Sequence, residues 1–161
     1  MKTNRTINYP SCDGVLERVN ASLAAFIAED IHLLQVNVGE RSITHRLADH
    51  LRASFKGWDV DCEYNRDGHD PKKVPLPNRH DPELIENTCV YPDIIVHIRG
   101  TKNNLLIIEA KKSSNKNQDA FDFDRIKLRS YIKHLRYQVG LFITLKTDES
   151  MESMFEVEPF T

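Results

Sequence analysis

The sequence predicts a mixed α/β domain in which helices cover a central sheet. Two observations predict this class: apolar residues recur at helical spacing in three segments, and they alternate or run continuously in shorter segments between them. The predicted order is helix, helix, three strands, helix, strand, which is typical of a sheet flanked by helices. With 161 residues and 40% hydrophobic side chains, the chain can bury one substantial core.

Bulk composition excludes several classes of protein. The formal net charge of −2 gives no overall signal for a polyanionic partner, and no window approaches the ~20 apolar residues that span a bilayer. The three cysteines lack the paired spacing of zinc sites or disulfide frameworks. The first residues, MKTNRTINYPSCDG, lack the apolar stretch of a signal peptide. We therefore expect a cytoplasmic protein with reduced thiols.

Two helices are predicted in the first third of the chain. Residues 13–36 have apolar side chains at helical spacing, with Asp13 as the expected N-cap. A second helix is expected over 38–55, where apolar residues recur at steps of four, and Gly57 follows where a helix-ending glycine is favoured.

The period then changes to that of strands. Residues 58–64 alternate between apolar and acidic side chains, which predicts a half-exposed strand. Residues 65–90 contain four prolines and read as a long loop. The segments 92–98 and 105–111 are predicted as two strands of a hairpin, joined by the short turn 99–103.

The last third is predicted to contain one helix and one strand. The helix is expected over 122–138, capped by Asp122 or Asp124, and the fully apolar strand over 139–145. Residues 146–161 contain acidic side chains and are expected to form a loose tail.

Strand alternation brings three charged residues together. In the segment 105–111, Ile107, Glu109 and Lys111 share one face of the strand. Antiparallel pairing places the start of the preceding strand beside the end of this one, so Asp93 lies next to Glu109 and Lys111. The competing interpretations are an exposed Glu109–Lys111 ion pair at a strand end and a simple turn role for Asp93.

Two carboxylates and one ammonium group in a small volume suit the chemistry of a divalent cation. Mg²⁺ prefers carboxylate and carbonyl oxygens and keeps waters and substrate phosphates as its other ligands. We expect Asp93 and Glu109 as metal ligands, with the carbonyl of Ala110 as a third and Mn²⁺ as a substitute for Mg²⁺. Lys111 would orient a metal-activated water or stabilise charge at phosphorus.

Pro92-Asp93, an apolar strand, a short turn, and a second strand ending in Glu109-Ala110-Lys111 together resemble the bipartite motif of the PD-(D/E)xK nuclease superfamily. The resemblance implies a restriction endonuclease-like core over 38–145, with 1–37 as an N-terminal extension and 146–161 as an acidic tail. It also implies Mg²⁺-dependent hydrolysis of phosphodiester bonds, usually in DNA.

The resemblance further implies a glutamate in the first core helix that completes the metal site, and Glu40 stands at the matching place. A second interpretation competes with this one. Asn37-x-x-Glu40 has the spacing of a helix N-cap and its reciprocal glutamate, so Glu40 is equally readable as part of a capping box.

Positive charge is concentrated near the last predicted helix. From Lys111 to Arg136 there are eight basic and three acidic residues, whereas 147–161 has five acids and no base. Arg125, Arg129, Lys133 and Arg136 follow one side of that helix. This stripe is either a phosphate-contacting edge or an ordinary solvated face. The resemblance also suggests Lys127 as a basic residue that joins the site.

These observations favour a metal-dependent DNA endonuclease of a restriction, phage-defence or repair type. A homodimer is expected, because one small active site cuts one strand, and the apolar helix 13–36 could form its interface. RNA is an alternative substrate. The alternative from another class is a catalytically inactive relative that binds nucleic acid or a partner protein.

Overall fold

The computed structural model describes residues 7–161, so the first six residues of the expected N-terminal extension lie outside it. The described chain forms three helices and nine strands. The elements are α1 (Cys12–Gln35), α2 (Glu40–Ser54), β1 (Asp59–Cys62), β2 (Arg66–Asp67), β3 (Asp70–Pro71), β4 (Lys73–Pro77), β5 (Ile85–Cys89), β6 (Ile94–His97), β7 (Asn104–Lys112), α3 (Gln118–Leu135), β8 (Val139–Leu145) and β9 (Phe155–Phe160).

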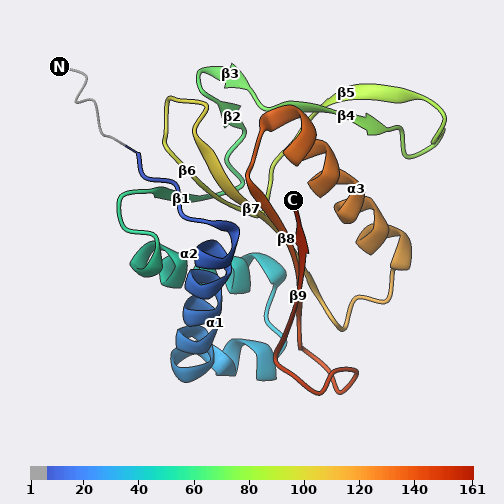
Figure 1. The fold of residues 1–161 in the computed structure, drawn as a ribbon. Coiled ribbons are helices and arrows are strands. Elements are labelled where there is room, and N and C mark those ends of the chain that lie inside the picture. The colour runs from blue at the N-terminus through green and yellow to red at the C-terminus, as the bar shows by residue number, and fades with distance from the viewer. Residues whose placement is uncertain (1–6) are drawn as a thin grey trace.

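Five strands form the central mixed sheet, in the order β1-β6-β7-β8-β9 (Figure 1). Only β7 and β8 are parallel, and α3 connects them, whereas the other neighbours are antiparallel. The sheet and its helices confirm the predicted α/β class and the predicted hairpin of β6 and β7.

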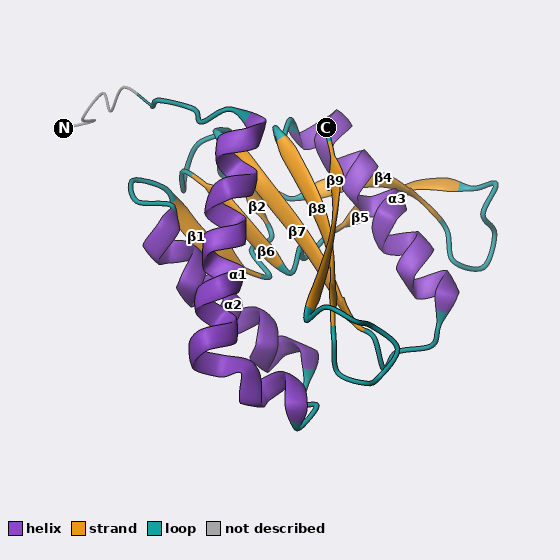
Figure 2. Cartoon of the chain, turned by 60° about the horizontal axis from the view of Figure 1, so that its bottom comes forward, coloured by secondary structure: helices purple, strands orange, loops and turns teal. Residues whose placement is uncertain are grey.

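Helices cover both faces of this sheet, with α1 and α2 on one side and α3 on the other (Figure 2). Strand alternation divides the core between these two layers. Leu106, Ile108 and Ala110 of β7 join the cluster under α1 and α2, while Ile107 packs with Tyr131 under α3. The face that carries Ile107, Glu109 and Lys111 is therefore the face that α3 covers.

The N-terminal helix α1 starts slightly earlier than its sequence indicated. Its N-cap is Ser11, whose hydroxyl accepts a hydrogen bond from the amide of Gly14, so the predicted Asp13 cap is wrong. The apolar stripe of α1, including Val19 and Phe26, is buried against the rest of the chain. The surface expected to form a dimer interface is therefore occupied within one chain. In the described part of the chain, no helix is long and apolar enough to cross a membrane.

Residues 65–90, predicted as a loop, instead form two small hairpins, β2–β3 and β4–β5. Prolines concealed β4, because Pro75 and Pro77 lack the amide that a central strand needs. A two-stranded ribbon has an outer edge on each strand, and that edge tolerates proline. Val74 and Leu76 are buried and belong to the cluster under α3, while β5 is exposed along its whole length.

The C-terminal region is also more ordered than its acidic composition indicated. Residues 155–160 form β9, which pairs antiparallel with β8 at the edge of the sheet, so the expected loose tail is wrong for this part. Phe155 and Val157 pack against the core under α1 and α2, and the intervening Glu156 is exposed. This alternation has the period of a strand, with Phe155 and Val157 on the face that α1 and α2 cover.

The last helix begins four residues before its predicted start. Its N-cap is Asn117, whose side chain accepts a hydrogen bond from the amide of Ala120, so neither Asp122 nor Asp124 caps it. The helix ends at Leu135, and Arg136 adopts a left-handed conformation with φ 58°. This earlier start places Asp124 in the second turn, where it faces the sheet.

Candidate active site

Asp93 lies immediately before β6, at the edge of a charged cluster between the sheet and α3. The register pairs Ile94 with Ile108, so Asp93 lies beside Glu109 as alternation predicted. Its Oδ2 accepts a hydrogen bond of 2.8 Å from the amide of Ala110. Burial raises the pKa of Asp93 to about 6, although this hydrogen bond favours the ionised form.

Glu109 is the most deeply buried member of the cluster, with 1% of its surface exposed. Lys127 donates to its Oε2 at 2.9 Å, and the hydroxyl of Tyr131 donates to its Oε1 at 3.0 Å. Burial raises the pKa of Glu109 well above its usual range, and the negative charge of Asp93 adds to this effect. A fully buried carboxylate held by two side chains of α3 is unlike the exposed ion pair considered from sequence.

Lys111 points to the same side of the sheet and reaches both helical layers. Its Nζ lies 2.7 Å from Oδ2 of Asp124 on α3 and 3.7 Å from Oε1 of Glu40 on α2. Oδ2 of Asp124 is buried, and the ion pair with Lys111 compensates its charge. Burial opposes the charge on Lys111, but Asp124 outweighs it and raises the pKa of the lysine.

Asp124 and Tyr131 are site residues that the sequence did not predict. Asp124 is 4% exposed and binds Lys127 through Oδ1 at 2.7 Å, in addition to Lys111. Helical spacing could have predicted them. Four residues recur at the intervals that define one helix face: Asp124, Lys127, Leu128 and Tyr131. The predicted helix start at residue 122 made Asp124 a candidate cap, and a cap residue is not expected to face the sheet.

Glu40 starts α2 and contacts the end of β7 from the opposite helical layer. Its Oε2 accepts a hydrogen bond of 3.1 Å from the amide of Lys112. The capping box is absent here, because the N-cap is Gly39 and makes no side-chain cap hydrogen bond. Asn37 instead accepts a hydrogen bond from Nζ of Lys112. Glu40 therefore faces the end of the strand that carries Glu109 and Lys111.

The predicted ligands are neighbours but do not form a closed coordination shell. Among residues 7–161, the one trio of metal-ligand side chains with all ligand atoms within 4.8 Å is Glu29, Asp30 and His50, on α1 and α2. In that trio Asp30 already binds His50 at 2.7 Å and the guanidinium of Arg46 at 2.8 Å, so it forms a clasp between helices. Glu40, Asp93 and Glu109 are less tightly gathered than this trio.

Negative charge exceeds positive charge in the cluster between α3 and the sheet edge. Four carboxylates face two ammonium groups, which leaves two uncompensated negative charges when all are ionised. The carboxylates are Glu40, Asp93, Glu109 and Asp124, and the ammonium groups are Lys111 and Lys127. The ammonium of Lys127 is held by its neighbours: burial lowers its pKa, but Glu109 and Asp124 outweigh this and raise it.

The basic residues predicted to form one stripe along α3 lie in different environments. Arg125 binds Glu158 of β9 at 2.8 Å, and the guanidinium of Arg129 lies over the ring of Phe160. Both arginines are therefore engaged by the C-terminal strand, whereas Lys133 is exposed. Lys127 lies on a different side of the helix and belongs to the buried cluster.

Comparison with protein-family models, with curated proteins and with solved structures finds no match to this chain.

Proposed function

We propose that this chain is a divalent-metal-dependent nuclease with a restriction endonuclease-like core. One observation carries the proposal: the carboxylate of Asp93 accepts a hydrogen bond from the amide of Ala110, between Glu109 and Lys111. This contact joins the two halves of the Pro92-Asp93 and Glu-x-Lys pattern. The order of α2, three sheet strands, α3 and β8 further supports such a core.

The cluster fits a hard divalent cation in charge and donor type. When all its members are ionised, its excess of two negative charges equals the charge of one Mg²⁺, and its donors are carboxylate oxygens. Asp93 and Glu109 would hold the ion, with Glu40 and the Ala110 carbonyl as further ligands and Mn²⁺ as a substitute. When bound, the cation would polarise a phosphoryl oxygen and lower the pKa of a coordinated water.

The chain's own residues have separable tasks in this proposal. The amide of Ala110 orients Asp93, and the hydroxyl of Tyr131 orients Glu109. Asp124 keeps Lys111 protonated and points its ammonium into the cluster. Lys111 would then orient the attacking water or stabilise the charge that develops on the phosphoryl oxygens, which is the usual task of a preorganised cation.

The proposed substrate is DNA, with RNA as the alternative, and the proposed assembly is a homodimer. Since the apolar stripe of α1 is buried within the chain, other surfaces would form the dimer. The exposed apolar residues Leu84 and Ile85 near the tip of the β4–β5 hairpin are available for contact. Light scattering on the purified chain tests this assembly.

The activity test uses circular and linear DNA and RNA, each with Mg²⁺, Mn²⁺ or a chelator. Wild-type protein is compared with Asp93→Asn and Lys111→Ala, and Lys56→Ala is the matched control because Lys56 is an exposed lysine next to the end of α2. We expect metal-dependent cleavage that both site variants lose and the control retains. Cleavage that survives both substitutions contradicts the proposed site. No cleavage of any substrate favours the catalytically inactive relative.

A further inference from the structure

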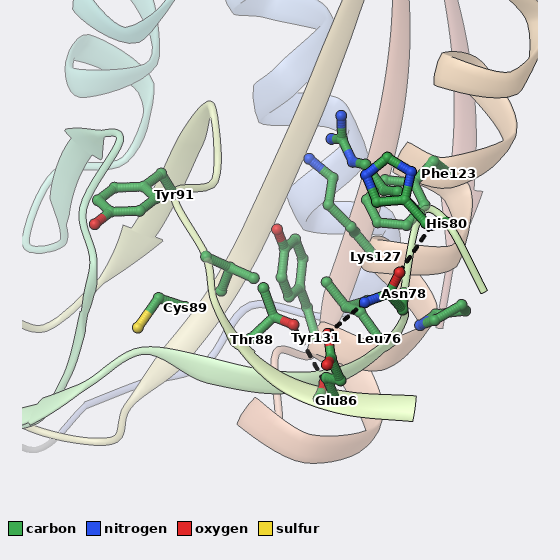
Figure 3. A pocket seen from close by; sticks show the side chains of 13 residues that line it. Leu76, Asn78, His80, Glu86, Thr88, Cys89, Tyr91, Phe123, Lys127 and Tyr131 are labelled. Carbon is green, nitrogen blue, oxygen red and sulfur yellow. Dashed lines mark hydrogen bonds between the residues drawn. The ribbon is translucent and has the colours of Figure 1, made fainter. Parts of the chain in front are cut away.

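A cavity of about 460 Å³ lies between the β4–β5 hairpin and α3 (Figure 3). It adjoins the carboxylate cluster, because Lys127 and Tyr131 line the cavity and also donate hydrogen bonds to Glu109. The β4–β5 hairpin forms the other wall. It is not part of the helix, three-strand, helix, strand order of the proposed core. The cavity therefore joins an added structural element to the proposed cleavage site.

The cavity wall combines flat apolar surfaces with positive charge. The guanidinium of Arg79 lies 4.9 Å from the centre of the Phe123 ring, and both residues line the cavity. Tyr91 lines it as well, is 56% exposed, and precedes Asp93 by two residues. Lys127 lies at the boundary with Glu109, paired with Glu109 and Asp124, and Glu86 is an acidic residue of the same wall. The buried residues Leu76 and Val90 give the cavity an apolar floor.

The loop that holds Arg79 is fixed from both sides. Asn78 donates a hydrogen bond of 2.9 Å to Glu86 on the opposite strand, and its Oδ1 accepts a hydrogen bond from the amide of His80 (Figure 3). The same Oδ1 also accepts a hydrogen bond from the amide of Asp81. Arg79 follows this anchored residue directly. These hydrogen bonds hold the backbone at Arg79, whose exposed side chain lies over Phe123.

We infer that this cavity binds one unpaired nucleobase of the DNA strand whose phosphodiester lies at the carboxylate cluster. The inference rests on the proposed nuclease function and adds a substrate preference to it. Bases of single strands stack on aromatic rings and arginine planes, which the pair of Phe123 and Arg79 supplies. A cavity of this size falls in the range that encloses small ligands, about 300–1,000 Å³. A base stacked inside a duplex must leave the helix before it can enter such a cavity.

Binding is measured with the full chain in a chelator, so that cleavage does not interfere. The probe is a short DNA strand with one 2-aminopurine, whose fluorescence falls when the base stacks, offered alone and in a duplex. Two variants test the wall: Arg79→Ala, in an exposed loop, and Phe123→Leu, which keeps an apolar side chain but removes the ring. Arg18→Ala is the matched control, since Arg18 also lies over a phenylalanine ring, that of Phe55 in the other helical layer.

We expect quenching with the single strand, less quenching with the duplex, and at least about fivefold weaker single-strand binding in both wall variants. The control variant is expected to bind like the wild type. Circular dichroism checks that each variant is folded. Equal quenching with paired and unpaired probes, or unchanged binding in both variants, overturns the inference. So does an absence of quenching.

A parallel cleavage assay separates this inference from the proposed function. Metal-dependent cleavage without quenching supports the proposed nuclease function and contradicts the binding of a base in the cavity. The opposite result is quenching that both wall variants weaken, with no cleavage of any substrate. It supports base binding in the cavity and contradicts the proposed nuclease function.

Discussion

Lys127 on α3 forms a buried ion pair with Glu109 on β7, with 2.9 Å between Nζ and Oε2. This pair joins the last helix to the central strand at the point where the carboxylates gather. It also places an ammonium group on an oxygen that the proposed metal would use. The protein would therefore exchange one cation for another at Glu109 when the metal binds.

Replacing Lys127 with methionine should make folding depend on metal. Loss of one partner of a buried ion pair costs about 3–5 kcal/mol, because the remaining charge has no compensation. We expect a large fall in melting temperature in a chelator and substantial recovery with Mg²⁺. Thermal unfolding with and without Mg²⁺ measures both effects. Lys133→Met, on the exposed side of the same helix, is the control, and a metal response that matches this control would contradict the proposed exchange.

Replacing Asp93 with asparagine should separate stability from activity. The amide is neutral and can still accept the hydrogen bond from Ala110, so the metal-free protein is expected to gain about 1–3 kcal/mol near pH 7 by losing a buried charge. Cleavage and stabilisation by Mg²⁺ should both disappear. Chemical unfolding and the DNA assay check the two outcomes, with Asp70→Asn as an exposed control. A variant that is less stable yet still active would contradict the assignment of Asp93.

Replacing Glu40 with glutamine distinguishes a metal ligand from a structural clip. Glutamine can keep the hydrogen bond from the Lys112 amide but carries no charge. If Glu40 helps to hold the metal, cleavage should fall about 10–100-fold with little change in stability. Cleavage rates over a range of Mg²⁺ concentrations measure this effect. Wild-type rates at every concentration would assign Glu40 to structure alone.

Lys72 should give the protein a stability that increases at alkaline pH. Its side chain is 1% exposed, and its Nζ lies 2.9 Å from the hydroxyl of Tyr137. Burial lowers the pKa of Lys72 to about 8, so between pH 8 and the ordinary value of about 10.4 the unfolded chain binds more protons than the folded one. Stability from this group therefore rises with pH across that window, by up to about 3 kcal/mol.

The difference between wild type and Lys72→Met isolates this contribution, because other groups titrate equally in both proteins. We expect the free energy of unfolding of Lys72→Met to exceed that of wild type by the largest margin at neutral pH. This margin should shrink as the pH approaches 10. Urea unfolding at several pH values measures the difference, and Lys73→Met is the exposed neighbouring control. A constant difference across the window would show that Lys72 is not buried as a charge.

Local rules predicted the half of the site that lies on paired strands. Antiparallel pairing and a period of two predicted that Asp93 lies near Glu109 and Lys111. They did not predict the β-bulge between Val96 and His97, which shifts the register by one residue from the His97–Asn104 pair to the Ile94–Ile108 pair. The contribution of α3 could not be predicted in the same way. Which helix face meets which strand residue depends on how the β7–α3–β8 connection packs, and this placed Tyr131 beside Glu109 and Asp124 beside Lys111.

The elements that the sequence missed are edge structures. Prolines in β4 and glutamates in β9 are poor signals for a strand, yet both strands lie at edges, where proline and charge are tolerated. Their ordering depends on packing: Leu76 of β4 is buried in the cluster under α3, and Val157 of β9 is half-buried against the core under α1 and α2. Propensity alone does not contain that information.

The hydrogen bond from Ala110 to Asp93 also gives the site a spectroscopic label. An amide proton bound to a carboxylate resonates according to the charge of its acceptor, so the Ala110 signal would change whenever Asp93 gains a proton or a cation. Because this amide belongs to the central strand, it would report from a rigid position. A single backbone resonance could thus follow the ionisation of the buried cluster without any added probe.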